Sequence, residues 1–145
     1  MKVRGCHPSG RPWIVAVPEP PKLEDLRRSV ERAKRNGQKG PVFTLAEEHD
    51  KNAEEDGKET EYLAILELRD GDAVATSGDY EKVIEHNGKL YSHVINGHLG
   101  RLLELNPITL AQAVVVAKKC ITADALATAA ISREDPAEAR ALLGE

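Results

Sequence analysis

The segment from Ala73 to Gly100 reads AVATSGDYEKVIEHNGKLYSHVINGHLG, and the rest of the chain is organised around it. Within it, Asn87-Gly88 separates two apolar runs, and this dipeptide favours the positive φ angles of a type I′ hairpin turn. We therefore expect two antiparallel strands joined at this turn. The returning strand carries His93, so the hairpin would bring an imidazole back toward the residues that open the segment.

Those opening residues form a corner of hydroxyl, glycine and carboxylate groups: Thr76, Ser77, Gly78 and Asp79. The hydroxyl and carboxyl groups suit hydrogen bonds to a phosphate-bearing ligand, and the glycine lets the backbone approach it closely. The same four residues also suit an ordinary turn. His93 has two interpretations as well, because a histidine at a strand end is either an acid or base of a site or a plain packed or surface residue.

Apolar, β-branched runs elsewhere predict further strands at 12–17, 42–45, 62–68 and 111–117. The last run contains three consecutive valines, so we expect it to be a central strand that is buried on both faces. The segment 101–110 shows no regular pattern, and we expect it to be irregular.

Three helices are expected. The first begins at Leu23 and ends at Asn36-Gly37, with its apolar residues at helical spacing. An alanine-rich helix over 123–131 follows Thr122, which suits the N-cap position. A last helix begins after Asp135, whose side chain suits the same capping role.

Composition limits the possible partners. The chain has 145 residues, which fits a single domain over 1–145, and a formal net charge of -4. Basic residues are interspersed with acidic ones and aromatic residues make up only 3%, so we expect no nucleic-acid partner. No run of about 18 apolar residues predicts a membrane span, and the first residues lack the apolar core of a signal peptide.

Asp124 and Thr128 lie four residues apart in the alanine-rich helix, so a carboxylate and a hydroxyl project from one face. Mg²⁺ prefers oxygen ligands and keeps waters or substrate phosphates in its other positions, so this pair could anchor the ion. Alternatively, Asp124 lies in the first helical turn and only complements the helix dipole, and Thr128 is an ordinary helical residue.

Together these motifs resemble the ApbE family of flavin transferases. The carboxyl-terminal half of that family contains, in order, a strand with a Trp, V-A-T-S-G-D-Y, a G-K-x-Y hairpin, H-I-I-D-P-x-T-G, a valine-rich strand and A-D-A-L-A-T. The corresponding elements here are Pro12 to Ile14, Val74 to Tyr80, Gly88 to Tyr91, His93 to Ile95, Val114 to Ala117 and Ala123 to Thr128. VATSGDY followed at this distance by ADALAT is specific to the family.

The resemblance implies an α+β domain with a mixed or antiparallel sheet and flanking helices. It implies transfer of the FMN moiety of FAD to a Thr or Ser hydroxyl of an acceptor protein through a phosphoester bond, with Mg²⁺ bound and AMP released. Asp124 and Thr128 would be the metal ligands, and His93 the catalytic residue, as a base or by orienting the pyrophosphate. FAD would contact six residues: Thr76, Ser77, Gly78, Asp79, Val94 and Ile95.

The sequence departs from the family pattern in three places. The H-I-I-D-P-x-T-G element continues here as Asn96-Gly97-His98-Leu99-Gly100, without the family's carboxylate and rigid proline turn. A charged stretch at about 28–61 is interpreted as an insertion, of which 46–61 predicts a solvated loop or frayed helix. The resemblance covers only about the second half of the family's length.

These departures leave a second interpretation open, a non-catalytic flavin-binding or assembly module or one half of a split enzyme. Such a chain would need a partner besides FAD and the acceptor protein. That partner would be a missing amino-terminal half or a second copy that covers the exposed sheet. Members of the family are commonly found in the bacterial cell envelope, and the sequence leaves the compartment open.

Overall fold

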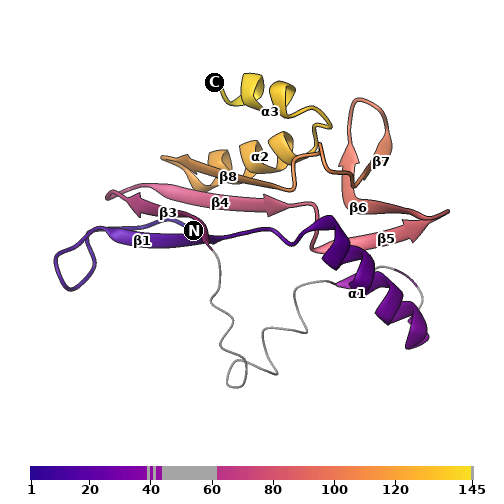
Figure 1. Cartoon of the computed structure of the whole chain (residues 1–145). Coiled ribbons are helices and arrows are strands. Elements are labelled where there is room, and N and C mark those ends of the chain that lie inside the picture. The colour runs from indigo at the N-terminus through magenta and orange to yellow at the C-terminus, as the bar shows by residue number, and fades with distance from the viewer. Residues whose placement is uncertain (39, 41, 44–61, 145) are drawn as a thin grey trace.

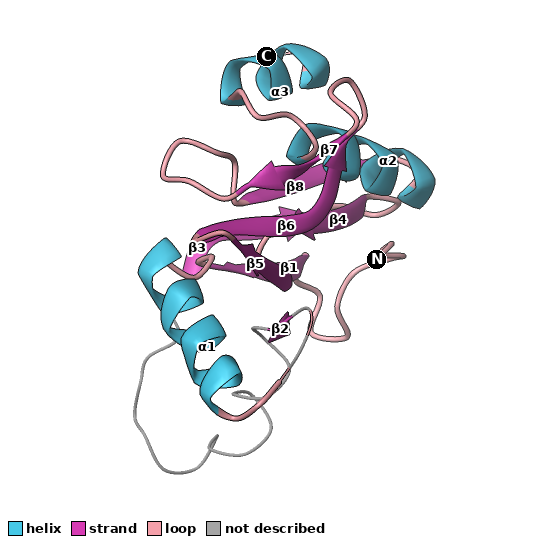
Figure 2. Ribbon diagram, turned by 90° about the vertical axis from the view of Figure 1, so that its right-hand side faces the viewer, coloured by secondary structure: helices cyan, strands magenta, loops and turns pink. Residues whose placement is uncertain are grey.

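The computed structural model describes residues 1–38, 40, 42–43 and 62–144, so the predicted loop at 46–61 lies outside the described residues. In chain order the elements are β1 (Trp13–Pro18), α1 (Leu23–Arg35), β2 (Val42–Phe43), β3 (Tyr62–Leu68), β4 (Ala73–Gly78), β5 (Lys82–His86), β6 (Lys89–Asn96), β7 (Arg101–Glu104), β8 (Gln112–Ala117), α2 (Cys120–Ile131) and α3 (Pro136–Leu143). Every described strand pairing is antiparallel. The predicted α+β class, with antiparallel sheets and flanking helices, is confirmed (Figure 1, Figure 2).

The predicted hairpin consists of β5 and β6. His86 pairs with Lys89, so the loop is Asn87-Gly88, with φ angles of 51° and 77°. Positive φ at both positions is the mark of a type I′ turn, whose twist matches that of the flanking strands. Adding β2 beside β5 and β7 beside β6 gives a four-stranded sheet in the order β2-β5-β6-β7.

Two further strand pairs, β1–β3 and β4–β8, pack face to face. The side chains between them form one apolar cluster: Val3, Trp13, Val15, Leu66, Leu68, Val74 and Val114. On the opposite face of β4–β8, α2 packs Ala123 and Ala127 against Val115. Figure 1 shows the three layers, with β1–β3 below, β4–β8 in the middle and α2 above. β4 therefore has one face toward β1–β3 and the other toward α2.

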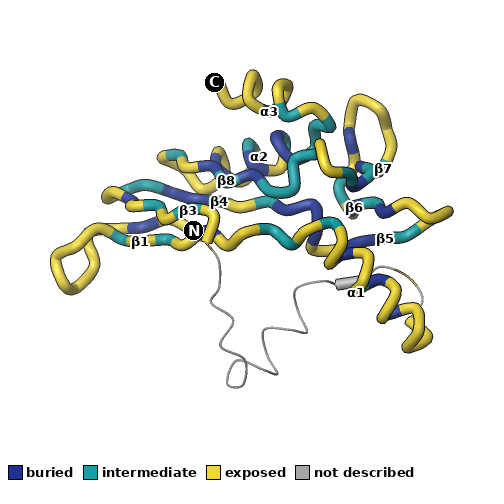
Figure 3. The backbone as a smooth tube through the Cα atoms, in the orientation of Figure 1, coloured by how far each residue is buried: buried dark blue, intermediate teal, exposed yellow. Residues whose placement is uncertain are grey.

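α1 covers the four-stranded sheet. Its buried residues Leu26, Val30 and Ala33 pack with Tyr80 and Leu90, as the helical spacing predicts. Figure 3 shows burial concentrated where the layers meet, while most of α3 and the outer side of α1 are exposed. No helix within the described ranges is long and apolar enough to cross a membrane.

Two strand predictions are wrong. The segment 101–110, predicted to be irregular, contains β7, which pairs with β6. β8, predicted to be a central strand buried on both faces, pairs within the described residues with β4 alone and leaves Val116 46% exposed. A run of β-branched residues favours a strand, but it does not determine how many neighbours that strand has.

The predicted start of α2 is also wrong. The helix begins at Cys120 rather than Ala123, and its N-cap is Lys119 rather than Thr122, with no side-chain cap. Asp124 therefore lies beyond the first turn. The capping prediction for α3 is confirmed, because the Asp135 carboxylate accepts the N–H of Ala137.

Candidate functional site

The predicted corner at the end of β4 is divided between two faces. Ala75 packs in the cluster with α2, whereas Val74 packs in the cluster with β1–β3. Because side chains alternate along a strand, Ser77 lies with Ala75 on the α2 side, and Thr76 lies with Val74 on the other. The structure therefore does not bring the two neighbouring hydroxyls together.

Ser77 instead meets a hydroxyl from α2. Ser77 Oγ and Thr128 Oγ1 are 3.3 Å apart and form a hydrogen bond at the surface. Ser77 belongs to the VATSGDY motif and Thr128 to the ADALAT motif, 51 residues later. A residue predicted to contact FAD and a residue predicted to bind metal are thus direct neighbours.

Asp124 lies one turn before Thr128 on α2, and its side chain is exposed. The helix-dipole alternative for Asp124 loses its basis, because the dipole effect is confined to the first turn and α2 starts at Cys120. Among the described residues no cluster of three or more His, Cys, Asp or Glu could hold a metal. The donors on this face of α2, a carboxylate and a hydroxyl, fit Mg²⁺, which accepts water as most of its ligands.

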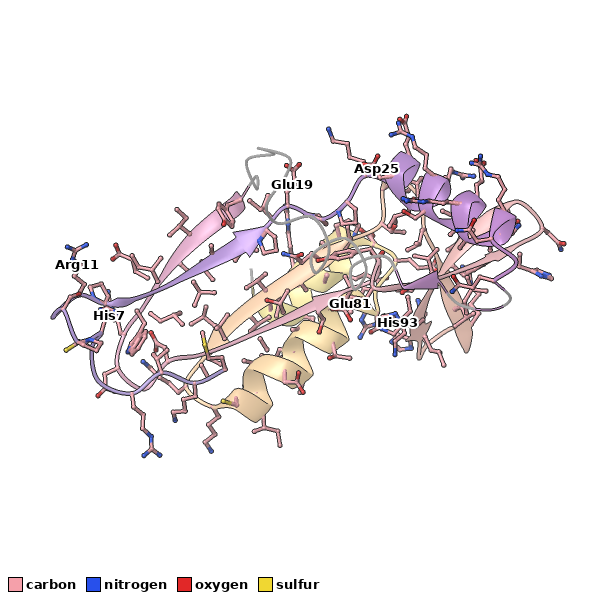
Figure 4. The ribbon with its side chains drawn as sticks, turned by 90° about the horizontal axis from the view of Figure 1, so that it is seen from below. His7, Arg11, Glu19, Asp25, Glu81 and His93 are labelled. Carbon is pink, nitrogen blue, oxygen red and sulfur yellow. The ribbon has the colours of Figure 1, made fainter. Side chains whose placement is uncertain are left out.

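His93 lies on a distorted part of β6. The register between β6 and β7 shifts between residues 91 and 95, which is a β-bulge, a feature enriched beside active sites. The buried Ser92 holds this bulge, because its Oγ accepts the N–H of Val94 at 3.1 Å. His93 is exposed (Figure 4), and within the described part of the chain it forms no hydrogen bond.

Val94 and Ile95 have different surroundings. Val94 packs against Ala113 of β8 and Ile131 of α2, whereas Ile95 is 59% exposed. Ala113 pairs with Ser77 across β4–β8. The contact of Val94 therefore places the β6 bulge beside the strand pair that carries Ser77.

Asp79 faces a different part of the molecule. Its side chain is only 3% exposed and lines a cavity of about 160 Å³. The apolar walls of this cavity come from α1, the segment before it and the loop that precedes β8: Pro21, Leu23, Leu26, Leu105, Pro107 and Ala111. Burial raises the pKa of Asp79 to about 7, while its own backbone amide acts in the opposite direction. None of the cavity's lining residues belongs to α2.

Gly78 is covered by the ring of Tyr80. A Cβ atom at position 78 would lie 2.8 Å from Tyr80 Cε1, closer than real contacts allow. The Tyr80 hydroxyl donates to Gln112 Oε1 at 2.6 Å, and Gln112 Nε2 donates to the carbonyl of Pro18 at 3.4 Å. The sequence pattern predicts no role for Tyr80 or Gln112, although the tyrosine two residues after Gly78 is an available signal.

The turn from Asn96 to Gly100, where the family pattern fails, is well ordered. Asn96 is 6% exposed, and its Oδ1 accepts the N–H groups of His98 at 3.0 Å and Leu99 at 3.1 Å. The N–H of Gly100 donates to the carbonyl of Asn96 at 2.8 Å. These hydrogen bonds fix the turn in place of the absent proline, and the amide supplies an acceptor oxygen in place of the family's carboxylate.

Comparison with known proteins identifies the family of the chain. The sequence model of the ApbE family matches residues 1–145. An FAD:protein FMN transferase of Vibrio cholerae serotype O1 is 43% identical over 56 residues, which cover 39% of this chain and 16% of that protein. One from Chlamydia pneumoniae is 34% identical over 76 residues, covering 52% of this chain and 24% of that protein. The matched segments thus span less than a quarter of either relative. The chain belongs to the ApbE family.

Proposed function

We propose that this chain takes part in the transfer of FMN from FAD to a Thr or Ser hydroxyl of an acceptor protein. The observation that carries the proposal is the contact between Ser77 and Thr128. It brings hydroxyl oxygens from the two most specific motifs together at the surface. Two relatives named FAD:protein FMN transferase support the same chemistry.

In this reaction the acceptor oxygen forms a bond to the FMN phosphorus of FAD. The bond from that phosphorus to the bridging oxygen breaks, and AMP leaves with the bridging oxygen. The acceptor's hydroxyl proton must be removed as the new bond forms. His93 suits this step, because its exposed imidazole projects from the bulge of β6 and an unprotonated ring nitrogen can accept a proton.

Asp124 and Thr128 would hold Mg²⁺, since both offer hard oxygen atoms on one face of α2. When bound, the ion would neutralise charge on the FAD pyrophosphate. Ser77 acts through Thr128, because its hydroxyl fixes the direction in which the Thr128 oxygen presents its lone pairs.

Mass spectrometry tests the proposal directly. The chain is mixed with FAD, MgCl₂ and an acceptor protein of the Vibrio cholerae relative, and the expected result is an acceptor that gains the mass of FMN. The assay is run with and without a supplied amino-terminal portion of that relative, and the complete relative is the positive control. No added mass in either arm, while the control adds FMN, would overturn the proposal.

The second candidate function is a non-catalytic flavin-binding or assembly module. The turn after β6 favours it, since Asn96, Gly97 and Leu99 replace the Asp, Pro and Thr of the family pattern there. FAD would then bind an open surface that a partner completes. Flavin fluorescence titration separates the two functions: FAD binding without AMP release supports the module, and binding with AMP release supports the transferase.

A further inference from the structure

The cavity beside Asp79 is lined by apolar side chains that come from distant parts of the chain. Leu23 and Leu26 of α1 form one wall, and Leu105 and Ala111 of the loop before β8 form another. Asp79 lies at the end of β4, between these walls, and its N–H donates to the carbonyl of Ala111 at 3.1 Å. The backbone of the acidic residue is therefore anchored while its side chain borders the cavity.

The other polar groups of the cavity are already satisfied. Asn106 Nδ2 donates to the carbonyl of Glu104, and Asn106 Oδ1 accepts the N–H of Ile108. Thr109 Oγ1 donates to the carbonyl of Asn106. These contacts build a local turn and leave both side chains engaged with their own loop.

The Asp79 side chain differs from these groups. Asp79 is only 3% exposed, and its carboxylate forms no ion pair or hydrogen bond to another described residue. Its own backbone amide is the one hydrogen-bond donor that acts on it among the described residues. Burying an unpaired carboxylate is costly, and a positively charged hydrogen-bond donor beside it offsets part of that cost. The cavity thus has mainly apolar walls and one carboxylate that no other described side chain pairs.

We infer that this cavity binds a small organic cation, a primary alkylammonium whose N–H groups bond the Asp79 carboxylate and whose alkyl chain packs on Leu23 and Leu26. An ionised carboxylate is an acceptor only, so a neutral alkyl ligand leaves it unpaired and an anion repels it. A hydrated metal ion does not fit, because the walls offer few oxygen ligands. The net charge of -4 also favours the approach of a cation.

The inference does not rest on FMN transfer, because none of the residues that line the cavity lies on α2, where the metal ligands are proposed. A failed transfer assay therefore leaves the inference intact, and a failed cation assay leaves the proposed transferase function intact.

Titration with n-butylammonium chloride, followed by ¹H–¹⁵N NMR at pH 8, tests the inference. The backbone amides of Asp79 and Ala111 should shift in a saturable way. n-Butanol has the same alkyl chain without the charge, and tetramethylammonium has the charge without N–H donors, so both should bind at least tenfold more weakly. Asp79→Asn should weaken n-butylammonium binding at least tenfold, whereas Glu81→Gln, an exposed acid in the same turn, should change it less than twofold.

A second variant tests the inference if Asp79→Asn folds poorly. Leu23→Phe narrows the cavity and leaves Asp79 unchanged, so it should also weaken n-butylammonium binding. If n-butanol binds as tightly as n-butylammonium, or if n-butylammonium still binds to both variants, the cavity does not recognise charge and the inference is overturned. Absence of a saturable shift in the natural sequence would overturn it as well.

Discussion

Ser77 Oγ lies 3.3 Å from Thr128 Oγ1, so a hydrogen bond connects the end of β4 to α2. The two residues occupy elements that already pack through Ala75, Ala123 and Ala127, so the apolar contact below sets the distance between the hydroxyls. The hydroxyl pair is therefore positioned by the core of the domain rather than by a flexible loop.

Removal of either hydroxyl should impair function more than folding. Thr128→Val and Ser77→Ala should each lower magnesium-dependent FAD binding at least tenfold, while the free energy of unfolding changes by about 1 kcal/mol or less, since an exposed hydrogen bond contributes little. Flavin fluorescence and urea denaturation measure the two effects. Thr122→Val, at an exposed threonine of the same helix, is the matched control. A similar loss in this control would contradict a specific role for the pair.

Asp124→Asn should remove the magnesium dependence, because an amide is a weaker ligand for a hard cation than a carboxylate. Isothermal titration with MgCl₂ in the presence of FAD should show at least a tenfold rise in Kd. Glu31→Gln, at an exposed acid of α1, should leave Kd within twofold. If Asp124→Asn binds magnesium as tightly as the natural sequence, Asp124 is not a magnesium ligand.

Gly78→Ala should destabilise the fold, because the new Cβ would lie 2.8 Å from Tyr80 Cε1 and the ring is held by its bond to Gln112. We expect a loss of about 1–3 kcal/mol in urea denaturation, as for other overpacked sites. Gly97→Ala provides the control, because its Cβ would meet nothing within 4 Å. That variant should stay within about 0.5 kcal/mol of the natural sequence.

Asp79 should make the domain less stable as pH rises. The unfolded carboxyl ionises near its ordinary pKa of 3.8, whereas burial holds the folded pKa at about 7. The protonated side chain therefore adds to the free energy of unfolding below pH 3.8. As pH rises from 3.8 to 7 this stabilisation is lost, by an amount on the order of 4 kcal/mol. Asp79→Asn should flatten this part of the profile. Urea denaturation at pH 4.5 and pH 8 measures both proteins, and equal slopes would rule out Asp79 as the source.

Asn96→Ala should loosen the turn between β6 and β7, since the N–H groups of His98 and Leu99 would lose their acceptor. The expected cost in urea denaturation is about 1–3 kcal/mol. Asn96→Asp keeps an acceptor oxygen and restores the family's residue, so it should retain more stability than Asn96→Ala. Equal losses in both variants would mean that the acceptor oxygen does not hold the turn.

Features that depend on neighbouring residues could be predicted from the sequence. Asn87-Gly88 determines a turn because few other residues adopt two consecutive positive φ angles, and Asp135 caps α3 because its carboxylate reaches a nearby amide. The resemblance also assigns Ser77 and Thr128 to one site, and the structure places their hydroxyls 3.3 Å apart.

Features that depend on distant segments could not be predicted in this way. Asp79 is buried because α1 and the loop before β8 close over it, and no local pattern reports that closure. Likewise, the VVV run indicated a strand, yet the exposure of Val116 follows from what packs beside β8. Lys119 occupies the N-cap position of α2, but its side chain forms no capping hydrogen bond. The start of that helix therefore depends on packing of its alanines rather than on a capping residue.

The packing of Tyr80 on Gly78 bears on how the family motif is inherited. The glycine and the tyrosine of VATSGDY hold each other in place through van der Waals contact and the bond to Gln112, with no flavin required. A descendant that had stopped transferring FMN would still be penalised for changing either residue. The presence of Gly78 and Tyr80 therefore reports on folding, whereas the surface hydroxyls of Ser77 and Thr128, which the apolar core does not need, report on function.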